Sequence, residues 1–272
     1  MSPRQAAELL ARHGLAPRRS LGQNFVVDPN TVRRIARLAG VGPGDAVVEI
    51  GAGLGALTAA LAETGAAVTA VEVDRGLVEV LREQFADAAV RVVEADARTL
   101  DWDGLLAGRP TWTLVANLPY NVATPLVADL LDGVPAIERM LVMVQREVAE
   151  RLAARPGTAA YGAVSVKVAY WATAEIVGRV PPTVFLPRPK VESALVAIAR
   201  RPQPAVAADV DRERLFALVR AGFGQRRKML RRSLAGLVDD NAFTAAGVRP
   251  EARAEELSVE DWGRLASAVS RS

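Results

Sequence analysis

The feature that most constrains the fold is an alternation of short apolar runs, rich in β-branched residues, with longer segments of helical periodicity. It begins near Asp45 and continues to about Val144. The apolar runs predict strands at residues 46–50, 67–73, 90–93, 113–116 and 140–144, and the longer segments predict helices at 54–63 and 75–85. Strands and helices that alternate at this spacing form a parallel sheet covered on both faces. We therefore expect an α/β fold.

The pattern changes after Tyr161. Apolar runs at 164–170, 174–180 and 193–199 follow one another without long helices between them, which favours antiparallel strands at a sheet edge. Residues 202–208 are typical of a linker, and helical patterns follow at 211–219, 226–237 and 259–268. We predict an α/β domain at 1–200, with a helical extension over 1–38, and a small all-helical domain at 201–272.

The composition excludes several classes of protein. The chain has no cysteine, so it has no disulfides, thiolate zinc sites or cysteine nucleophiles, and a reducing cytoplasm is the simplest compartment. No uninterrupted apolar run reaches the roughly 18 residues that a membrane span needs. The N-terminal residues lead into an amphipathic segment rather than a secretion signal. We expect a cytoplasmic protein without membrane contact.

The distribution of charge is more informative than the net charge of +3. Between residues 220 and 232 the chain carries cations and no acid, namely Arg220, Arg226, Arg227, Lys228, Arg231 and Arg232. A second such cluster contains Arg12, His13, Arg18 and Arg19. A single cluster is commonly just a solvated helix face. Two acid-free clusters in an otherwise balanced chain favour a polyanionic partner.

A glycine-rich turn lies between the first strand and the first helix of the alternating region. Residues 49–55 read Glu-Ile-Gly-Ala-Gly-Leu-Gly, and glycines such as Gly51 and Gly53 allow positive φ and close approach of a ligand to the backbone. The dinucleotide pattern Gly-x-Gly-x-x-Gly fits poorly, because Ala56 stands at its last position. The Glu-x-Gly-x-Gly-x-Gly form resembles the first motif of S-adenosylmethionine-dependent methyltransferases.

Two acids stand at the ends of the next strands. Glu72 stands at the end of the second strand and could bind both ribose hydroxyls, and Asp96 stands at the end of the third and could accept from an adenine amine. Each alone could be a helix cap. Because ligands of open α/β sheets bind at the carboxyl ends of strands, the acids and the glycines together predict a cofactor site. No histidine or third carboxylate converges on Glu72 and Asp74, so we expect no metal site.

The next strand ends in Asn117, Leu118, Pro119 and Tyr120. The Asn117 amide oxygen can accept from an exocyclic amine, Pro119 stiffens the loop, and Tyr120 offers a stacking face. In isolation the segment is as readily a plain strand-to-helix connection, since Asn and Pro are turn residues.

These motifs together resemble the ribosomal RNA adenine dimethyltransferases. The resemblance rests on residues 21–28, 49–55, 117–120, 181–194 and 223–234, in that order along the chain. The last two stretches resemble the bacterial branch that dimethylates two adjacent adenosines near the 3′ end of 16S rRNA. The resemblance implies a Rossmann-like methyltransferase domain, with a mostly parallel seven-stranded sheet and an antiparallel edge, and a small helical C-terminal domain.

The resemblance also implies residue roles. The S-adenosylmethionine site would comprise Asn24, the backbone of Val26, Gly51, Gly53, Glu72, Asp96 and Asn117. Catalysis would involve Asn117, Leu118 and Pro119, with Tyr120 and Phe185 stacking the flipped target base from two sides. The cations at 220–232 would bind RNA. The chain departs from the family pattern at Val26, Ala123 and Glu192, and Ala123 removes one possible hydroxyl contact.

The implied substrate is 16S rRNA within an immature small subunit, and we expect the chain to act as a monomer. Three alternatives stay open at this point. One is a 23S rRNA adenine methyltransferase of the macrolide-resistance type, against which residues 181–194 and 223–234 argue. Another is a DNA adenine methyltransferase, although the chain has no separate base-reading domain. The last is a non-catalytic ribosome assembly factor.

Overall fold

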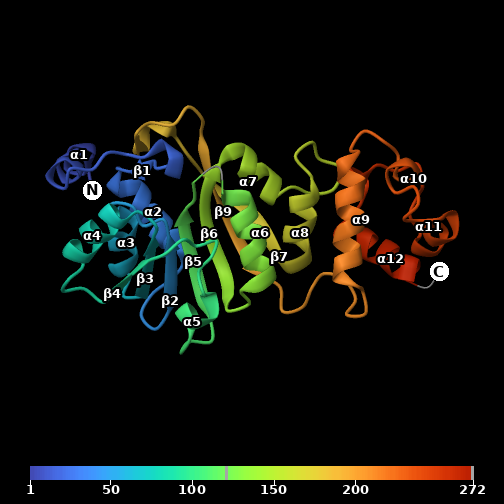
Figure 1. Cartoon of the computed structure of the whole chain (residues 1–272), viewed down its shortest axis with the longest axis horizontal. Helices are drawn as coiled ribbons and strands as arrows, with labels where there is room; N and C mark the ends of the chain where they lie inside the picture. The colour runs from blue at the N-terminus through green and yellow to red at the C-terminus, as the bar shows by residue number, and fades with distance from the viewer. Residues whose placement is uncertain (120–121, 271–272) are drawn as a thin grey trace. The chain divides into compact units, whose positions relative to one another are not determined.

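The computed structural model describes residues 1–119 and 122–270 (Figure 1). Its strands are β1 (Phe25–Val26), β2 (Ala46–Ile50), β3 (Ala67–Glu72), β4 (Val90–Glu94), β5 (Trp112–Asn117), β6 (Ile137–Gln145), β7 (Ala172–Val180), β8 (Phe185–Leu186) and β9 (Ser193–Arg200). Its α-helices are α1 (Pro3–Arg12), α2 (Pro29–Ala39), α3 (Ala56–Ala62), α4 (Arg75–Gln84), α5 (Trp102–Leu106), α6 (Ala123–Gly133), α7 (Arg146–Leu152), α8 (Ala163–Trp171), α9 (Arg212–Gly224), α10 (Leu230–Ser233), α11 (Asp240–Ala246) and α12 (Val259–Ser270). Among the described residues, no helix has the length and apolar character needed to span a bilayer.

The main sheet has seven strands in the order β4-β3-β2-β5-β6-β9-β7. Strands β4 to β6 in this order pair in parallel, and β9 runs antiparallel to β6. The predicted mostly parallel sheet with antiparallel pairing toward one edge is confirmed. The strand order reverses between β2 and β5, which is where open α/β sheets bind ligands at their carboxyl ends.

Both faces of the sheet are buried, as its central strand β5 shows. Val115 packs in one cluster with Ile35 of α2 and Leu61 of α3. Its neighbours Leu114 and Ala116 point to the opposite face and are also buried. Helix α6 passes in front of the strands in Figure 1. A sheet covered on two sides explains why the strands read as continuous apolar runs rather than alternating ones.

The chain divides into two compact units, and the division differs from the predicted single boundary at residue 200. The first unit contains residues 1–149 and 175–199, and the second contains 150–174 and 200–272. The second unit has its own core, with Trp262 and Phe243 fully buried. In that core the Tyr161 hydroxyl donates to the Leu257 carbonyl at 3.0 Å. Residues 150–174 therefore belong, by their packing, with the C-terminal helices.

One predicted strand is wrong. Residues 164–170 form most of helix α8 rather than a strand. Their valines favour β structure, but Val166 and Tyr170, four residues apart, both face the helical core that contains Leu215 of α9. The Ser165 hydroxyl also accepts from the Gly162 amide at 3.0 Å and so caps the start of the helix. Packing outweighs local propensity here.

The predicted helix at 226–237 is also largely wrong. Helix α9 ends at Gly224, and within residues 226–237 the structure forms only the short helix α10. Backbone hydrogen bonds to a distant segment replace the helical ones: the Leu230 amide donates to Ala252 at 2.8 Å and the Arg231 amide to Pro250 at 3.0 Å. The predicted helices at 211–219 and 259–268 are confirmed by α9 and α12.

Candidate functional site

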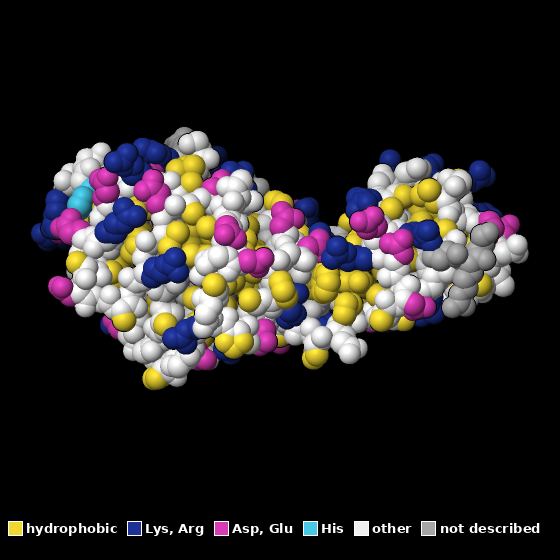
Figure 2. Space-filling model, turned by 60° about the horizontal axis from the view of Figure 1, so that its bottom comes forward, with side chains coloured by type: hydrophobic (Ala, Val, Ile, Leu, Met, Phe, Trp, Pro, Cys, Tyr) yellow, Lys and Arg dark blue, Asp and Glu magenta, His cyan; other side chains and the backbone are white. Residues whose placement is uncertain are grey.

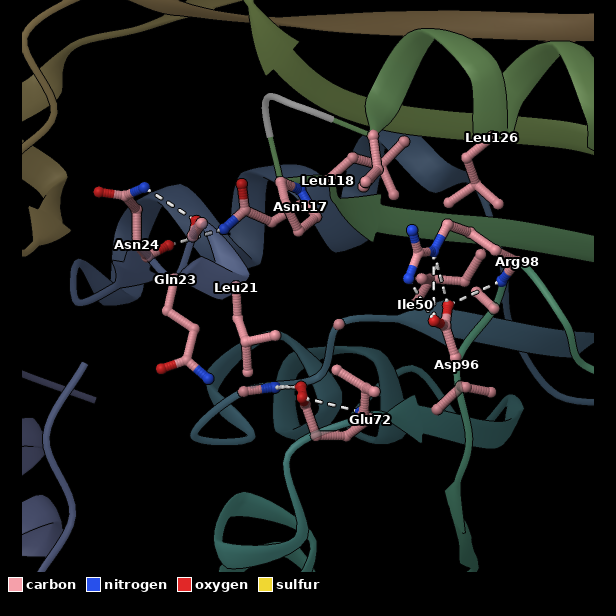
Figure 3. A pocket seen from close by; sticks show the side chains of 18 of the residues that line it. Leu21, Gln23, Asn24, Ile50, Glu72, Asp96, Arg98, Asn117, Leu118 and Leu126 are labelled. Atoms are coloured by element: carbon pink, nitrogen blue, oxygen red, sulfur yellow. Dashed lines mark hydrogen bonds and ion pairs between the residues drawn. The ribbon is translucent and has the colours of Figure 1, made fainter. Parts of the chain in front are cut away.

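A cavity lies at the carboxyl ends of the parallel strands (Figure 3). Its lining includes predicted site residues from five separate segments of the chain: Asn24, Gly51, Gly53, Glu72, Asp96, Asn117, Leu118 and Pro119. The apolar side chains of Ile50, Val73 and Leu126 complete much of the wall. Parallel pairing of β2, β3, β4 and β5 brings these residues together, because every strand ends at the same edge.

The glycines form an open cradle at the end of β2. Gly51 and Gly53 have φ values of +73° and +58°, which are left-handed conformations that favour glycine. A Cβ on Gly53 would lie 2.9 Å from the Phe25 ring, so the turn has no room for a side chain there. The exposed backbone at Gly51 lines the cavity, and a ligand can approach it closely.

Glu72 is buried at the end of β3 and is held by backbone donors. One carboxylate oxygen accepts from Gly53 at 2.9 Å, and the other accepts from Val73 and Asp74, each at 2.9 Å. Burial raises the pKa of Glu72, and these hydrogen bonds oppose the rise. A carboxylate has about four acceptor positions, so three donors leave roughly one for a ligand. Backbone donors therefore use most of the acceptor positions of Glu72, and its binding of ribose hydroxyls stays a prediction.

Asp96 lies at the cavity wall, but its carboxylate already has a partner. The Arg98 guanidinium donates to both oxygens, with Nη2 2.6 Å from Oδ2 and Nε 3.1 Å from Oδ1. This side-chain hydrogen bonding lowers the pKa of Asp96 below its usual value. Nothing in the sequence pattern pointed to Arg98, because an arginine two residues after an acid is common on surfaces.

Asn117 is oriented by a contact with a residue 93 positions earlier. Its Nδ2 donates to the Asn24 backbone carbonyl at 2.9 Å (Figure 3). A carbonyl only accepts, so the amide nitrogen must face Asn24 and the Oδ1 must point the other way. No donor to that oxygen occurs among residues 1–119 and 122–270. The side chain therefore offers a fixed acceptor, as the predicted role requires.

The segment that contains Asn24 is attached to the start of α4. Gln23 donates through Nε2 to Asp74 Oδ2 at 3.0 Å and accepts from the Arg18 amide at 2.7 Å. Asp74 is 4% exposed, and its other oxygen caps α4 by accepting from Gly76 at 3.0 Å. Sequence reasoning missed this connection. Asp74 before a helix was recognisable as a cap, but its bond to Gln23 was not.

The structure does not bring every predicted residue to the cavity. Val26 and Phe185 are opposite each other in the β1–β8 pair, and their side chains are 6% and 4% exposed in the core that contains Ile35. As placed, the Phe185 ring has no face available to a base. Tyr120, the other predicted stacking residue, lies outside the described residues.

The predicted RNA-binding cations belong to the second unit, and two of them have acidic partners. Arg226 Nε lies 2.8 Å from Glu255, and Arg231 Nη1 lies 3.7 Å from Glu251. Lys and Arg side chains lie among acidic ones on the face shown in Figure 2. No ion pair of Arg220, Arg227, Lys228 or Arg232 occurs within the described ranges, and all four residues are exposed.

The lining residues fit S-adenosylmethionine. Glu72 has an acceptor position left for a ribose hydroxyl, and Asp96 follows the end of the neighbouring strand β4 at the same edge of the sheet. Apolar side chains beside them suit the flat adenine ring, and the open backbone at Gly51 leads toward Asn117, whose carbonyl is 3.6 Å from a Cβ built on Gly51. The donor methyl group would then lie near the Asn117 amide.

Comparison with known proteins gives matches over almost the whole length of this chain. The chain is 49% identical to the ribosomal RNA small subunit methyltransferase A of Thermobifida fusca over 277 residues, which cover 98% of this chain and 95% of that protein. It is 47% identical to the protein of the same name from Streptomyces avermitilis, covering 98% of this chain and 92% of the relative.

Solved structures of related enzymes also match this chain over most of its length. The 23S rRNA methyltransferase ErmE superposes with a TM-score of 0.69 at 29% identity, over 90% of this chain and 99% of that one. A dimethyladenosine transferase from Plasmodium falciparum has a TM-score of 0.73 at 22% identity, over 89% and 95%, and at that identity it supports the fold alone. The family model "Ribosomal RNA adenine dimethylase" matches residues 14–270. The chain therefore belongs to the ribosomal RNA adenine dimethylase family.

Proposed function

We propose that this chain transfers methyl groups from S-adenosylmethionine to the N6 atoms of two adjacent adenosines in small-subunit ribosomal RNA. The observation that carries the proposal is the Asn117–Asn24 hydrogen bond, because it points the Asn117 Oδ1 away from Asn24 at the wall of the cavity. Relatives at 44–49% identity are small-subunit enzymes by name, whereas the 23S enzyme ErmE is 29% identical. This difference favours the small-subunit substrate.

The chemistry needs acceptors rather than a base or a metal. Adenine N6 is a weak nucleophile because its lone pair is delocalised into the ring. If the Asn117 Oδ1 and the Leu118 carbonyl both accept from the amine, the nitrogen moves toward tetrahedral geometry and its lone pair becomes available. The bound cofactor supplies an electrophilic methyl group on its sulfonium. In the transfer that these acceptors would promote, the N–C bond would form as the S–C bond of the cofactor breaks, and the amine would then lose a proton to water.

The chain contributes chiefly by positioning and by charge. Holding two reactants in line can lower a barrier by about 7–11 kcal/mol. The two oxygens also stabilise the positive charge that develops on N6 during transfer. Buried Leu118 keeps this strand end in place, since its amide donates to Met143 of β6 at 3.0 Å.

The second transfer places a different demand on the same groups. N6-methyladenine has one N–H instead of two, so only one of the two acceptors can be used, and the first methyl group needs space. The Asn117 Oδ1 is the acceptor that the Asn24 contact fixes. We expect the second methylation to depend on Asn117 at least as strongly as the first.

We propose that RNA binds to the exposed cations of the second unit, namely Arg220, Arg227, Lys228 and Arg232. An immature small subunit is the proposed form of the substrate, and the enzyme is proposed to act on it as a monomer in the cytoplasm. The Tyr120 and Phe185 stacking roles remain proposals. For Phe185 the stacking role requires the ring to leave the core in which it is buried.

The experiment is a methylation assay with a choice of substrates. The purified protein is incubated with radiolabelled S-adenosylmethionine and unmodified small or large subunits, and the labelled bases are mapped. We expect label at two adjacent adenosines of small-subunit RNA, as N6,N6-dimethyladenine. Label in large-subunit RNA alone would overturn the substrate assignment in favour of the 23S alternative. No label with either particle, combined with tight binding to small subunits, would support an assembly factor instead.

A further inference from the structure

Arg98 forms a fork on the carboxylate of Asp96 at the wall of the cavity. Its Nε lies 3.1 Å from Oδ1 and 3.2 Å from Oδ2, its Nη2 lies 2.6 Å from Oδ2, and its own amide donates to Oδ1 at 3.0 Å. Both side chains line the cavity, and Figure 3 shows the guanidinium of Arg98 close against the carboxylate of Asp96. The contact thus lies inside the site rather than on a remote surface.

The fork leaves the carboxylate with little spare capacity. The Arg98 amide, Nε and Nη2 are three donors to a group with about four acceptor positions. About one acceptor position is therefore left for a ligand amine. The hydrogen bonds from Arg98 are the largest cause of the lowered pKa of Asp96, so the group stays ionised and cannot donate.

The exposure of Arg98 argues against a purely structural purpose. Its side chain is 62% exposed, and an ion pair at such exposure contributes little to folding. The Arg98 backbone amide already holds Asp96 Oδ1. The guanidinium adds a second constraint by binding both oxygens of this side chain, which is 32% exposed. Lysine could supply the charge but not the planar fork.

We propose that Arg98 is a positioning residue that makes the cofactor site selective for a 6-amino purine, by holding Asp96 as an oriented group that only accepts hydrogen bonds. The proposal rests on S-adenosylmethionine as the cofactor. A 6-amino group donates to such a carboxylate. A 6-oxo group presents an oxygen to it, and the two acceptors repel.

The test compares two product analogues that differ at this one position, S-adenosylhomocysteine and S-inosylhomocysteine. Calorimetry measures the Kd of each for the wild type, Arg98→Ala, Arg98→Lys and Asp96→Asn, without RNA. We expect the wild type to prefer the amino ligand by about 100-fold, the size of effect that a mismatched polar partner produces in a binding site. Arg98→Ala should raise the Kd of S-adenosylhomocysteine by about tenfold and reduce the preference for the amino ligand. Arg98→Lys should recover only part of that affinity and preference.

Two further variants, Arg75→Ala and the double variant Asp96→Asn with Arg98→Ala, sharpen the test. Arg75→Ala removes a comparable exposed ion pair, with Glu79, and should leave both Kd values unchanged. Asp96→Asn introduces a donor and should abolish the preference. In the double variant, Arg98→Ala should then have almost no additional effect on the preference, because Arg98 acts through Asp96. Thermal unfolding without ligand identifies any variant that is misfolded.

Several outcomes would overturn the proposal. Tighter binding of S-adenosylhomocysteine by Arg98→Ala would make Arg98 a competitor for Asp96 rather than its positioner. If Arg98→Ala kept the wild-type preference for the amino ligand, Arg98 would have no positioning role. The same conclusion would follow if the effects of Arg98→Ala and Asp96→Asn on the preference were additive in the double variant. Failure of the wild type to bind S-adenosylhomocysteine would refute the cofactor and this proposal together. If the methylation assay found no activity, or activity on 23S rRNA alone, while calorimetry still showed the preference for the amino ligand, only the proposed function would be refuted.

Discussion

The side-chain amide of Asn117 donates to the backbone carbonyl of Asn24 at 2.9 Å, and this bond joins the end of β5 to the segment before β1. Two parts of the cavity wall that are far apart in the sequence are thereby connected through one side chain. The same bond decides which amide atom of Asn117 is free to act as an acceptor, and the proposed role of Asn117 in methyl transfer depends on that atom.

Asn117→Ala should lower the methylation rate by about 10²–10³-fold, because the acceptor at the amine is removed. Cofactor affinity should fall only modestly, since Asn24 keeps its own bond to Gly22 at 3.0 Å. Single-turnover kinetics and calorimetry with S-adenosylhomocysteine separate the two effects. Asn117→Asp keeps an acceptor but places an oxygen against the Asn24 carbonyl, so it should impair cofactor binding more than Asn117→Ala does. Undiminished turnover in Asn117→Ala would contradict the assigned role.

Gln23→Ala should weaken cofactor binding by removing one of the two attachments of the segment at 18–25 to Asp74, while the Arg18 Nη1 contact at 3.5 Å is kept. A hydrogen bond to a charged partner contributes about 1.5–3 kcal/mol, which sets an upper limit of roughly tenfold to a hundredfold in Kd. The rate at saturating cofactor should change little, since Gln23 does not contact the amine acceptors. Gln5→Ala, which alters only the cap of α1, is the control. Equal Kd values for Gln23→Ala and Gln5→Ala would show that the attachment has no function.

Glu49 should make stability depend on pH. It is 1% exposed with the Thr58 hydroxyl 2.6 Å away, and burial raises its pKa from 4.5 to about 8. Between these values the folded state holds a proton that the unfolded state releases, so stability falls as pH rises, by up to about 1.4 kcal/mol per unit. Buried Glu72, whose pKa is also raised, adds to this in the same direction.

Glu49→Gln isolates this effect, because glutamine can still accept from Thr58 and carries no proton to lose. The variant should gain stability relative to the wild type as pH rises from 5 to 8. Urea unfolding at several pH values measures the difference, with the exposed Glu79→Gln as control. A wild-type-minus-variant difference that stays constant with pH would show that Glu49 is ionised in the folded protein.

Substituting the exposed cations should change how RNA binding depends on salt. Arg227→Ala with Lys228→Ala should reduce the slope of log K against log salt by about 0.7–0.9 for each phosphate that the protein no longer neutralises. Arg226→Ala is the informative comparison, because Arg226 is held by Glu255 and by the Ala159 carbonyl at 2.7 Å. It should affect stability of the second unit more than the salt slope. Identical slopes for wild type and the double variant would place the RNA elsewhere.

Phe185→Leu separates packing from stacking. Truncating the buried ring to alanine should cost about 3–5 kcal/mol of unfolding free energy, whereas leucine keeps much of the volume. If Phe185 stacks on the target base, the leucine variant should fold and bind cofactor but lose about 1–3 kcal/mol of base-stacking interaction. Full activity in a stable Phe185→Leu variant would assign this residue to the core alone.

The sequence by itself determined the alternating part of the fold and the residues at its strand ends. The strands from β2 to β6 and the lining residues Gly51, Glu72, Asp96 and Asn117 were all predictable. The physical reason is that strand and helix periodicity are local properties, and parallel pairing then places every carboxyl end at one edge without further information.

Only the tertiary structure decided the features that depend on partners far away in the sequence. Residues 164–170 became a helix because Val166 and Tyr170 pack in a helical core, and the helix expected at 226–237 is broken by backbone bonds to 250–252. Glu255 neutralises part of a cluster that contains no acid in its own sequence. Burial and hydrogen-bond partners are set by contacts across the fold, and a local window of sequence does not contain them.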